Sequence, residues 1–181
     1  AQDFELFSPT EFDATVSDDN GFAYTLPSSR VNAVQWLEGG SMLGVGALGS
    51  EFIMSTTDGA PMTPINTVAR RRSTFGSEDV RSVNIESSTM YLQRGGQRLR
   101  EFIYSFSPEA SAQTAIGEDL TILASHILRE GTKGTDMVYQ QQPGSVVHTT
   151  RTDGQLASMT INRRQNVFGW SRHLLGGSFG T

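Results

Sequence analysis

Short apolar runs separated by glycine, asparagine, aspartate and serine dominate the chain from residue 31 onward. Such runs, with turn residues between them, are typical of antiparallel strands joined by hairpins. Asp153-Gly154, between two alternating runs, is a specific marker of a tight hairpin turn. The pattern therefore predicts an all-β fold. The expected strands cover residues 31–37, 42–47, 51–55, 80–85, 90–93, 99–106, 137–141, 146–150, 156–161 and 167–173.

The strands fall into three successive groups along the chain. Leu43, Met90 and Val147 hold comparable places in these groups and are 47 and 57 residues apart. A unit of about 40 to 50 residues with three or four strands is typical of β-propeller blades. We therefore expect propeller-like blades of antiparallel strands, forming a partial propeller, over residues 31–181. Residues 1–30 are expected to form an N-terminal lead-in segment.

One segment has a helical period instead of a strand period. Asp119 is placed to cap the start of a helix there, and Gly131 to end it. We expect one short amphipathic helix, inserted at about residues 117–131 between the second and third groups of strands. Its apolar face would consist of Leu120, Leu123, Ala124, Ile127 and Leu128.

Composition narrows the classes of protein that the chain can belong to. Its 181 residues correspond to about one domain, and the net charge of −5 argues against a broad phosphate-binding surface. Cysteine is absent, which excludes disulfides, thiolate zinc sites and thiol nucleophiles. No run approaches the roughly 18 apolar residues that a membrane helix needs, so no membrane segment is expected. The chain begins at Ala1 without a signal sequence, which favours a piece of a longer protein.

Two glycine motifs resemble catalytic or nucleotide-binding signatures. The first, at residues 44–49, matches G-x-G-x-x-G, but the residues after it are typical of a strand and not of the helix that would bind a pyrophosphate. The second, at residues 176–180, matches G-x-S-x-G, but no helix can follow it before Thr181. We interpret the first as a glycine-rich hairpin and assign no nucleophile to the second.

The remaining ionisable residues do not form a recognisable site. His126, His148 and His173 have no metal-binding spacing, and the adjacent Glu118 and Asp119 are poorly placed to act as an acid and base pair. We therefore predict no catalytic residue, no cofactor and no metal site, and interpret the chain as a protein that is not an enzyme.

Arginines are the candidate contact residues. Arg70, Arg71 and Arg72 form one basic run, for which we favour ion pairs or a subunit contact over a phosphate contact. Acidic residues close to this run in sequence, Glu78, Asp79 and Glu86, are its expected partners. A second group, near the predicted second hairpin, is expected to form ion pairs where blades or subunits meet. Its members are Arg94, Arg98 and Arg100.

Several phrases of the chain, in this order and spacing, together resemble one protein family. They are VNAVQWL at residues 31–37, LGVG at 43–46, GSEF at 49–52, RRSTFGS at 71–77, MYLQRGGQRLREF at 90–102, DLTILASHI at 119–127, RTDG at 151–154 and FGWSRH at 168–173. The family is tail tubular protein B, the nozzle class of short-tailed bacteriophages. The resemblance runs from about Val31 to His173 and so covers most of the chain.

The resemblance implies a β-propeller-based structural subunit of the virion. In this family a hexameric ring stands at the end of the tail, next to other tail or adaptor proteins, and double-stranded DNA leaves through its centre. Such a subunit is made in the host cytoplasm and then located in the phage tail. A net acidic chain repels a polyanion, which suits a conduit through which DNA must slide. The expected anchors of the core are Trp36, Phe52, Tyr91, Phe102, Tyr104, Phe168 and Trp170.

Two alternatives remain open from the sequence. One is a head-completion plug that retains packaged DNA, which differs only in its place in the particle. The other is a carbohydrate-binding or carbohydrate-cleaving propeller for host-surface recognition, with Tyr91, Tyr104 and Trp170 as candidate aromatic contacts. Cleavage would also need two carboxylates a few ångströms apart, and no such pair stands out by its spacing.

Overall fold

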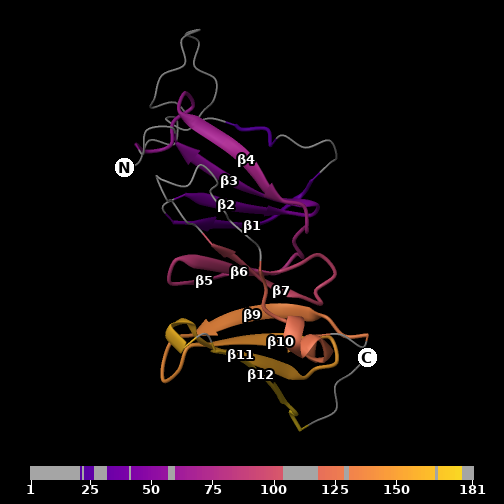
Figure 1. Ribbon diagram of the computed structural model, residues 1–181. Helices are drawn as coiled ribbons and strands as arrows, with labels where there is room; N and C mark the ends of the chain where they lie inside the picture. The colour runs from indigo at the N-terminus through magenta and orange to yellow at the C-terminus, as the bar shows by residue number, and fades with distance from the viewer. Residues whose placement is uncertain are drawn as a thin grey trace, which may run out of the picture.

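The fold is built from three antiparallel sheets of four strands each, arranged one after another along the molecule (Figure 1). The computed structural model describes residues 21, 23–26, 32–40, 42–56, 60–103, 118–128, 131–165 and 167–176. Within these residues the chain is mostly β-strand with very little helix, which confirms the predicted all-β class.

Each sheet is a meander, because strands that follow one another in the chain are neighbours in the sheet. Sheet I contains β1 (Val34–Gly39), β2 (Leu43–Ala47), β3 (Ser50–Thr56) and β4 (Thr67–Ser73). Sheet II contains β5 (Val83–Ile85), β6 (Ser88–Leu92), β7 (Leu99–Ile103) and β8 (Glu118–Asp119). Sheet III contains β9 (Gly134–Gln140), β10 (Val146–Arg151), β11 (Leu156–Asn162) and β12 (Val167–His173).

The period of the fold is more regular than the sequence pattern suggested. The first strands of the three sheets begin at Val34, Val83 and Gly134, which are 49 and 51 residues apart. Most predicted strands lie within two or three residues of an observed one, and β12 has the predicted bounds. The short β8 and the arginine-rich β4 were not predicted as strands.

Buried aromatic side chains join sheet I to sheet II. Trp36 and Ile53 of sheet I pack against Tyr91 and Phe102 of sheet II in one apolar cluster. The ring centroids of Trp36 and Tyr91 are 5.3 Å apart, and Phe102 meets Trp36 edge-on at 6.3 Å. Fully burying a side chain of this kind contributes roughly 1.5–3 kcal/mol to the free energy of unfolding. We call such a packed contact between two sheets a seam.

A larger apolar cluster joins sheet II to sheet III. Met90, Leu92 and Leu99 of sheet II are buried against Met137 and Met159 of sheet III. Phe168 and Trp170 on β12 pack on its border and are partly buried. Of the predicted core anchors, Trp36, Phe52, Tyr91 and Phe102 are therefore buried, whereas Tyr104 lies outside the described residues.

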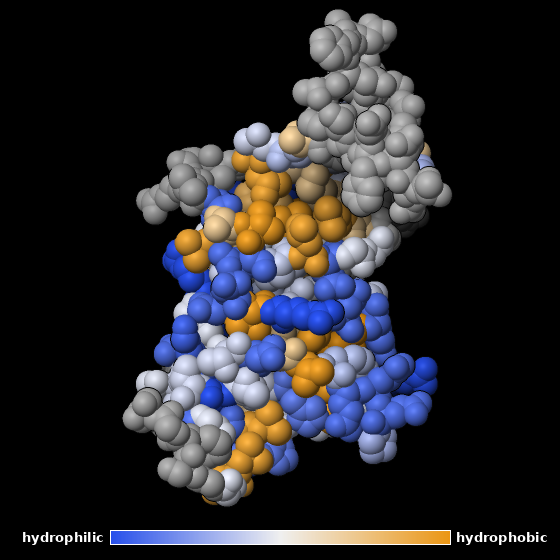
Figure 2. All heavy atoms as spheres, turned by 180° about the vertical axis from the view of Figure 1, so that it is seen from behind, coloured by the Kyte–Doolittle hydropathy of each residue, from blue (hydrophilic) through white to orange (hydrophobic). Residues whose placement is uncertain are grey.

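The far face of sheet I carries a third apolar cluster. Phe52, Val45 and Met54 are buried there, with Leu26 and Met62 packed against them. Seen from behind, hydrophobic residues gather over this end of the molecule, while hydrophilic residues cover much of its middle (Figure 2).

The predicted amphipathic helix is wrong in type and partly wrong in orientation. Asp119 belongs to β8, and the helical turn that follows is the 3-10 helix η2 (Ile122–Ile127), kinked at Ala124. Ile127 is buried as expected, but Leu123 is 96% exposed. A 3-10 helix has three residues per turn, so the α-helical spacing places Leu123 on the wrong face. Among the described residues, no helix is long and apolar enough to cross a membrane.

Candidate functional site

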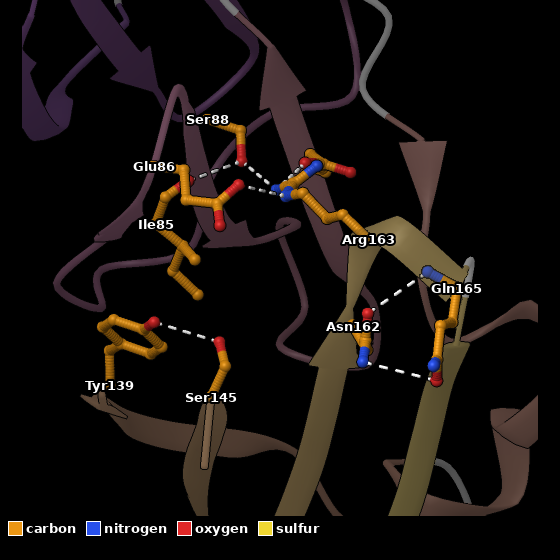
Figure 3. Close-up of polar contacts among 9 residues, drawn as sticks. Ile85, Glu86, Ser88, Tyr139, Ser145, Asn162, Arg163 and Gln165 are labelled. Atoms are coloured by element: carbon orange, nitrogen blue, oxygen red, sulfur yellow. Dashed lines mark hydrogen bonds and ion pairs between the residues drawn. The ribbon is translucent and has the colours of Figure 1, made fainter. Parts of the chain in front are cut away.

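A polar cleft opens between sheets II and III (Figure 3). It has a volume of about 520 Å³. Turns and strand ends form its walls: the β5–β6 turn, the residue before β10, the end of β11 and the short 3-10 helix η3 (Arg163–Gln165). We call it the seam cleft. Its lining residues are Ile85, Glu86, Ser145, Ile161, Asn162, Arg163 and Arg164.

Arg163 crosses from sheet III to sheet II at this cleft. Its Nη2 forms an ion pair with Glu101 of β7 and donates a hydrogen bond to the Ser88 hydroxyl. Its Nε lies 3.6 Å from a carboxylate oxygen of Glu86, which is an ion pair too long for a hydrogen bond. The side chain of Glu101 is only 2% exposed, and a buried carboxylate requires such a partner. Arg163 therefore fixes η3 against sheet II.

The other walls of the cleft are also held by hydrogen bonds. The hydroxyls of Tyr139 and Ser145 are 3.0 Å apart. The Asn162 side chain accepts a hydrogen bond from the backbone N–H of Gln165 at 3.2 Å and so closes the η3 turn. Glu86 has a φ of 57°, a left-handed conformation that is rare for glutamate and that occurs here in the β5–β6 turn. The cleft is thus bounded by restrained turns.

A second cleft, of about 360 Å³, lies where the first strands of all three sheets meet. Its lining comes from Glu38 of β1, from the segment that leads into and includes β5, and from Met137 to Tyr139 of β9. The Ser82 hydroxyl donates a hydrogen bond to the Glu38 carboxylate at 3.1 Å and links sheet I to sheet II there. The first strands therefore converge on one side of the molecule.

The basic run predicted as a contact lies on β4, an edge strand of sheet I. Arg70 and Arg71 are exposed and form no ion pair within the described part of the chain. Partial burial, and then the charge of Arg70, lower the pKa of Arg72. A β-bulge interrupts the pairing of β4 with β3 at this point. Charges and bulges on an edge strand oppose unwanted strand pairing.

Two of the three acidic residues expected to pair with that run, Glu78 and Glu86, have other partners. Glu78 accepts a hydrogen bond from the backbone of Gly95 at 2.7 Å and forms an ion pair with Lys133 at 3.3 Å. Glu86 faces Arg163 at the seam cleft. Closeness in sequence did not identify the ion-pair partners of the arginine run. Glu78 belongs to the segment that leads into sheet II, and its carboxylate connects a turn of sheet II with the residue that precedes sheet III.

The arginines of the second group have three different surroundings. Arg94 is exposed in the β6–β7 turn. Arg98 forms an ion pair with Asp119 at 2.8 Å, so this contact lies within sheet II. Arg100 is 7% exposed. Its guanidinium carbon lies 3.5 Å from the centroid of the Phe75 ring, and its Nε donates to Gln93 at 2.7 Å. Arg100 is therefore enclosed between sheet II and the segment that leaves sheet I.

A buried carboxylate, Glu51 of β3, lies in the same region as Arg100. Its side chain accepts hydrogen bonds from the hydroxyls of Ser73 and Ser77, the latter at 3.1 Å. Burial raises the pKa of Glu51, although these serines and the charge of Arg100 act in the opposite direction. The carboxylate thus holds the segment after β4 against β3.

The buried glutamates were missed in the sequence, although a signal for them exists. Glu51-Phe52-Ile53 recurs 50 residues later as Glu101-Phe102-Ile103, each time in the third strand of its sheet. Ile53 packs toward sheet II, and Phe102 packs back toward sheet I. Because side chains alternate along a strand, both glutamates face the next sheet. A charged residue at the same place in two repeats indicates an equivalent structural position in both.

The histidines occupy separate places. His126 is exposed on η2, and His173 is exposed on β12. His148 lies between Ser158 and Gln140, with its ring nitrogens 2.7 Å and 3.0 Å from their side-chain oxygens. The described residues contain no group of three or more histidine, aspartate or glutamate side chains that could hold a metal ion.

The glycines of residues 44–49 form a β-hairpin, as predicted. The motif runs along β2 and through the turn into β3, so no helix follows it. Gly46 has a packing role, because a Cβ there would lie 2.0 Å from the Trp36 ring. In the second motif, only Gly176 belongs to the described residues.

No protein-family model matches this chain, and no curated protein matches its sequence. The features of this chain that bear on its function are the packed contacts between its sheets and the polar cleft at one of them.

Proposed function

We propose that this chain is a structural subunit, without enzymatic activity, of a bacteriophage tail nozzle ring through which DNA is ejected. The observation that carries the proposal is the succession of three four-stranded meanders with starts 49 and 51 residues apart. Consecutive meanders of this length are the building plan of propeller blades. This succession of sheets supports the blade architecture that the resemblance to the tail tubular protein B family implies.

The contacts between the sheets support a scaffolding role. Apolar clusters fill both seams, and Arg163 and Arg100 add charged contacts at their borders. A stack held in this way resists deformation, because its packed interfaces have few alternative arrangements. The convergence of β1, β5 and β9 on one side is what a fan of blades around an axis requires.

The proposed partners are further copies of the chain, in a hexameric ring, and the adjacent tail or adaptor proteins. Arg70 and Arg71 on the exposed edge of sheet I are candidate contacts to a neighbouring copy. Double-stranded DNA would pass without tight binding, since the net charge of −5 opposes adhesion of a polyanion.

Immunogold electron microscopy tests this proposal. Antibodies against the purified chain should label phage particles from the source at the free end of the tail. Label at the junction of head and tail would favour the head-completion plug instead. Particles that carry no label, although the antibody recognises the chain in the same lysate, would contradict a virion role.

A further inference from the structure

We propose that the seam cleft binds a neutral saccharide. The cleft is lined by polar residues of three separate segments, with Ile85 and Ile161 largely buried beneath them. Its volume of about 520 Å³ lies within the range of small-ligand sites, and such sites orient their ligands through a few fixed polar groups. This proposal goes beyond the nozzle role and does not depend on it.

One donor of the cleft is already fixed in position. The guanidinium of Arg163 is held from behind by the buried Glu101 and by Ser88. In the described part of the chain its Nη1 makes no hydrogen bond to another residue. A donor that is immobilised before the ligand arrives loses little conformational entropy on binding. Arg163 can therefore offer a preorganised N–H group to a ligand oxygen.

The balance of charges selects the class of ligand. Arg163 and Arg164 line the cleft together with Glu86, and Arg163 pairs with Glu86 and with the buried Glu101 behind the cleft. The formal charge of these four residues sums to zero. A phosphate or sulfate would gain little from such a site, because the carboxylate of Glu86 would repel it. A neutral ligand meets no such penalty.

The hydrogen-bonding groups match hydroxyls. The arginines only donate, and Glu86 only accepts in its ionised form. Ser145 and Asn162 can do both. A sugar hydroxyl also donates and accepts, so a saccharide can pair with donors and acceptors placed side by side. This lining of mixed donors and acceptors favours a saccharide over a purely apolar ligand.

The test is saturation-transfer difference NMR on the purified chain, followed by titration. The probes are maltotriose, cellotriose and triacetylchitotriose, with inorganic phosphate as the charged comparator. At least one trisaccharide should bind, and phosphate should not. Arg164→Ala should weaken that binding about fivefold, the effect of one lost hydrogen bond. Arg172→Ala, which removes an exposed arginine of β12 outside the cleft, should leave the affinity unchanged.

A second variant, Glu86→Gln, asks whether binding depends on the negative charge of the cleft. It keeps an acceptor oxygen but removes that charge, so binding of the neutral saccharide should persist. The absence of binding by every trisaccharide would overturn the proposal, as would equal effects of Arg164→Ala and Arg172→Ala. Phosphate binding without saccharide binding would overturn it too. These outcomes are independent of the immunogold test of the nozzle role, so failure of one proposal can be told apart from failure of the other.

Discussion

At the scale of single residues, two buried glutamates mark the places where the sheets meet. Glu101 is matched by Arg163 from the following sheet, and Glu51 by two serines and the nearby charge of Arg100. Buried charges are costly unless they are paired, so each of them restricts how its neighbours can pack. Removing one partner of such a contact is therefore expected to cost more than the intact contact adds to the net stability.

Removing Arg163 tests the first of these pairs. Arg163→Ala should lower the free energy of unfolding by about 3–5 kcal/mol, because it leaves the Glu101 carboxylate buried without its partner. Arg164→Ala, at the next residue, is the matched control and should change it by less than about 0.5 kcal/mol. Urea denaturation followed by circular dichroism measures both. Equal effects of the two substitutions would show that the Glu101 contact does not stabilise the seam.

The pH dependence of stability tests Glu51. Its pKa is raised by burial in the folded state, so its contribution to stability is fully present below the unfolded value of 4.5. That contribution is lost as the pH rises through the folded-state pKa. Glu51→Gln has no carboxylate to ionise, so its stability relative to the wild type should increase from pH 4.5 toward neutrality.

Denaturation at a series of pH values makes this comparison. Glu118→Gln, at an exposed position of β8, is the control and should follow the wild type. A constant difference between Glu51→Gln and the wild type over this pH range would contradict a raised pKa.

At the scale of elements, the strands with clear turns were predictable. The hairpins of sheet III lie beside Pro143-Gly144 and Asp153-Gly154, where turn chemistry and alternation agree. β4 was not predicted because its three consecutive arginines hide the alternation of apolar and polar residues that marks a strand. The β-bulge in its pairing with β3 interrupts that alternation further. The helical turn was predicted with the wrong period, since a kinked 3-10 helix has no distinct sequence signature.

A glycine in sheet I provides a test at this scale. Gly46→Ala should destabilise the fold by about 1–3 kcal/mol or more, because the new Cβ would collide with Trp36 in the seam to sheet II. Gly39→Ala is the control, because a Cβ at this position of β1 would have no atom within 4 Å, and it should be neutral or slightly stabilising. Thermal melts of the two variants compare them directly. Similar melting temperatures would contradict the close approach of Trp36 to β2.

At the scale of the whole molecule, the two seams differ in extent. In the described residues the apolar cluster between sheets II and III draws on most of their strands, whereas the one between sheets I and II rests on few side chains. Local stability follows the amount of buried apolar contact. Hydrogen exchange should therefore show sheets II and III opening together, and sheet I opening at a lower free energy. Equal protection of β2 and β10 amides would contradict this order.

The seam cleft could not have been predicted from the sequence. Arg163 and Glu101 are far apart in the chain, and neither belongs to a spacing that signals a site. Only the stacking of sheet III on sheet II brings them together. Arg100 was singled out for its place near a hairpin, but its contact with Phe75 depends on the path of the chain between two sheets.

Cryo-electron microscopy of tailed phage particles that contain this chain tests the nozzle proposal most directly. The account predicts density for the three stacked sheets, repeated around the tail axis in a hexameric ring at its free end. In that density, β1, β5 and β9 should lie toward the axis of a closed propeller. A complete reconstruction of the tail whose density contains no such stack would contradict the proposal.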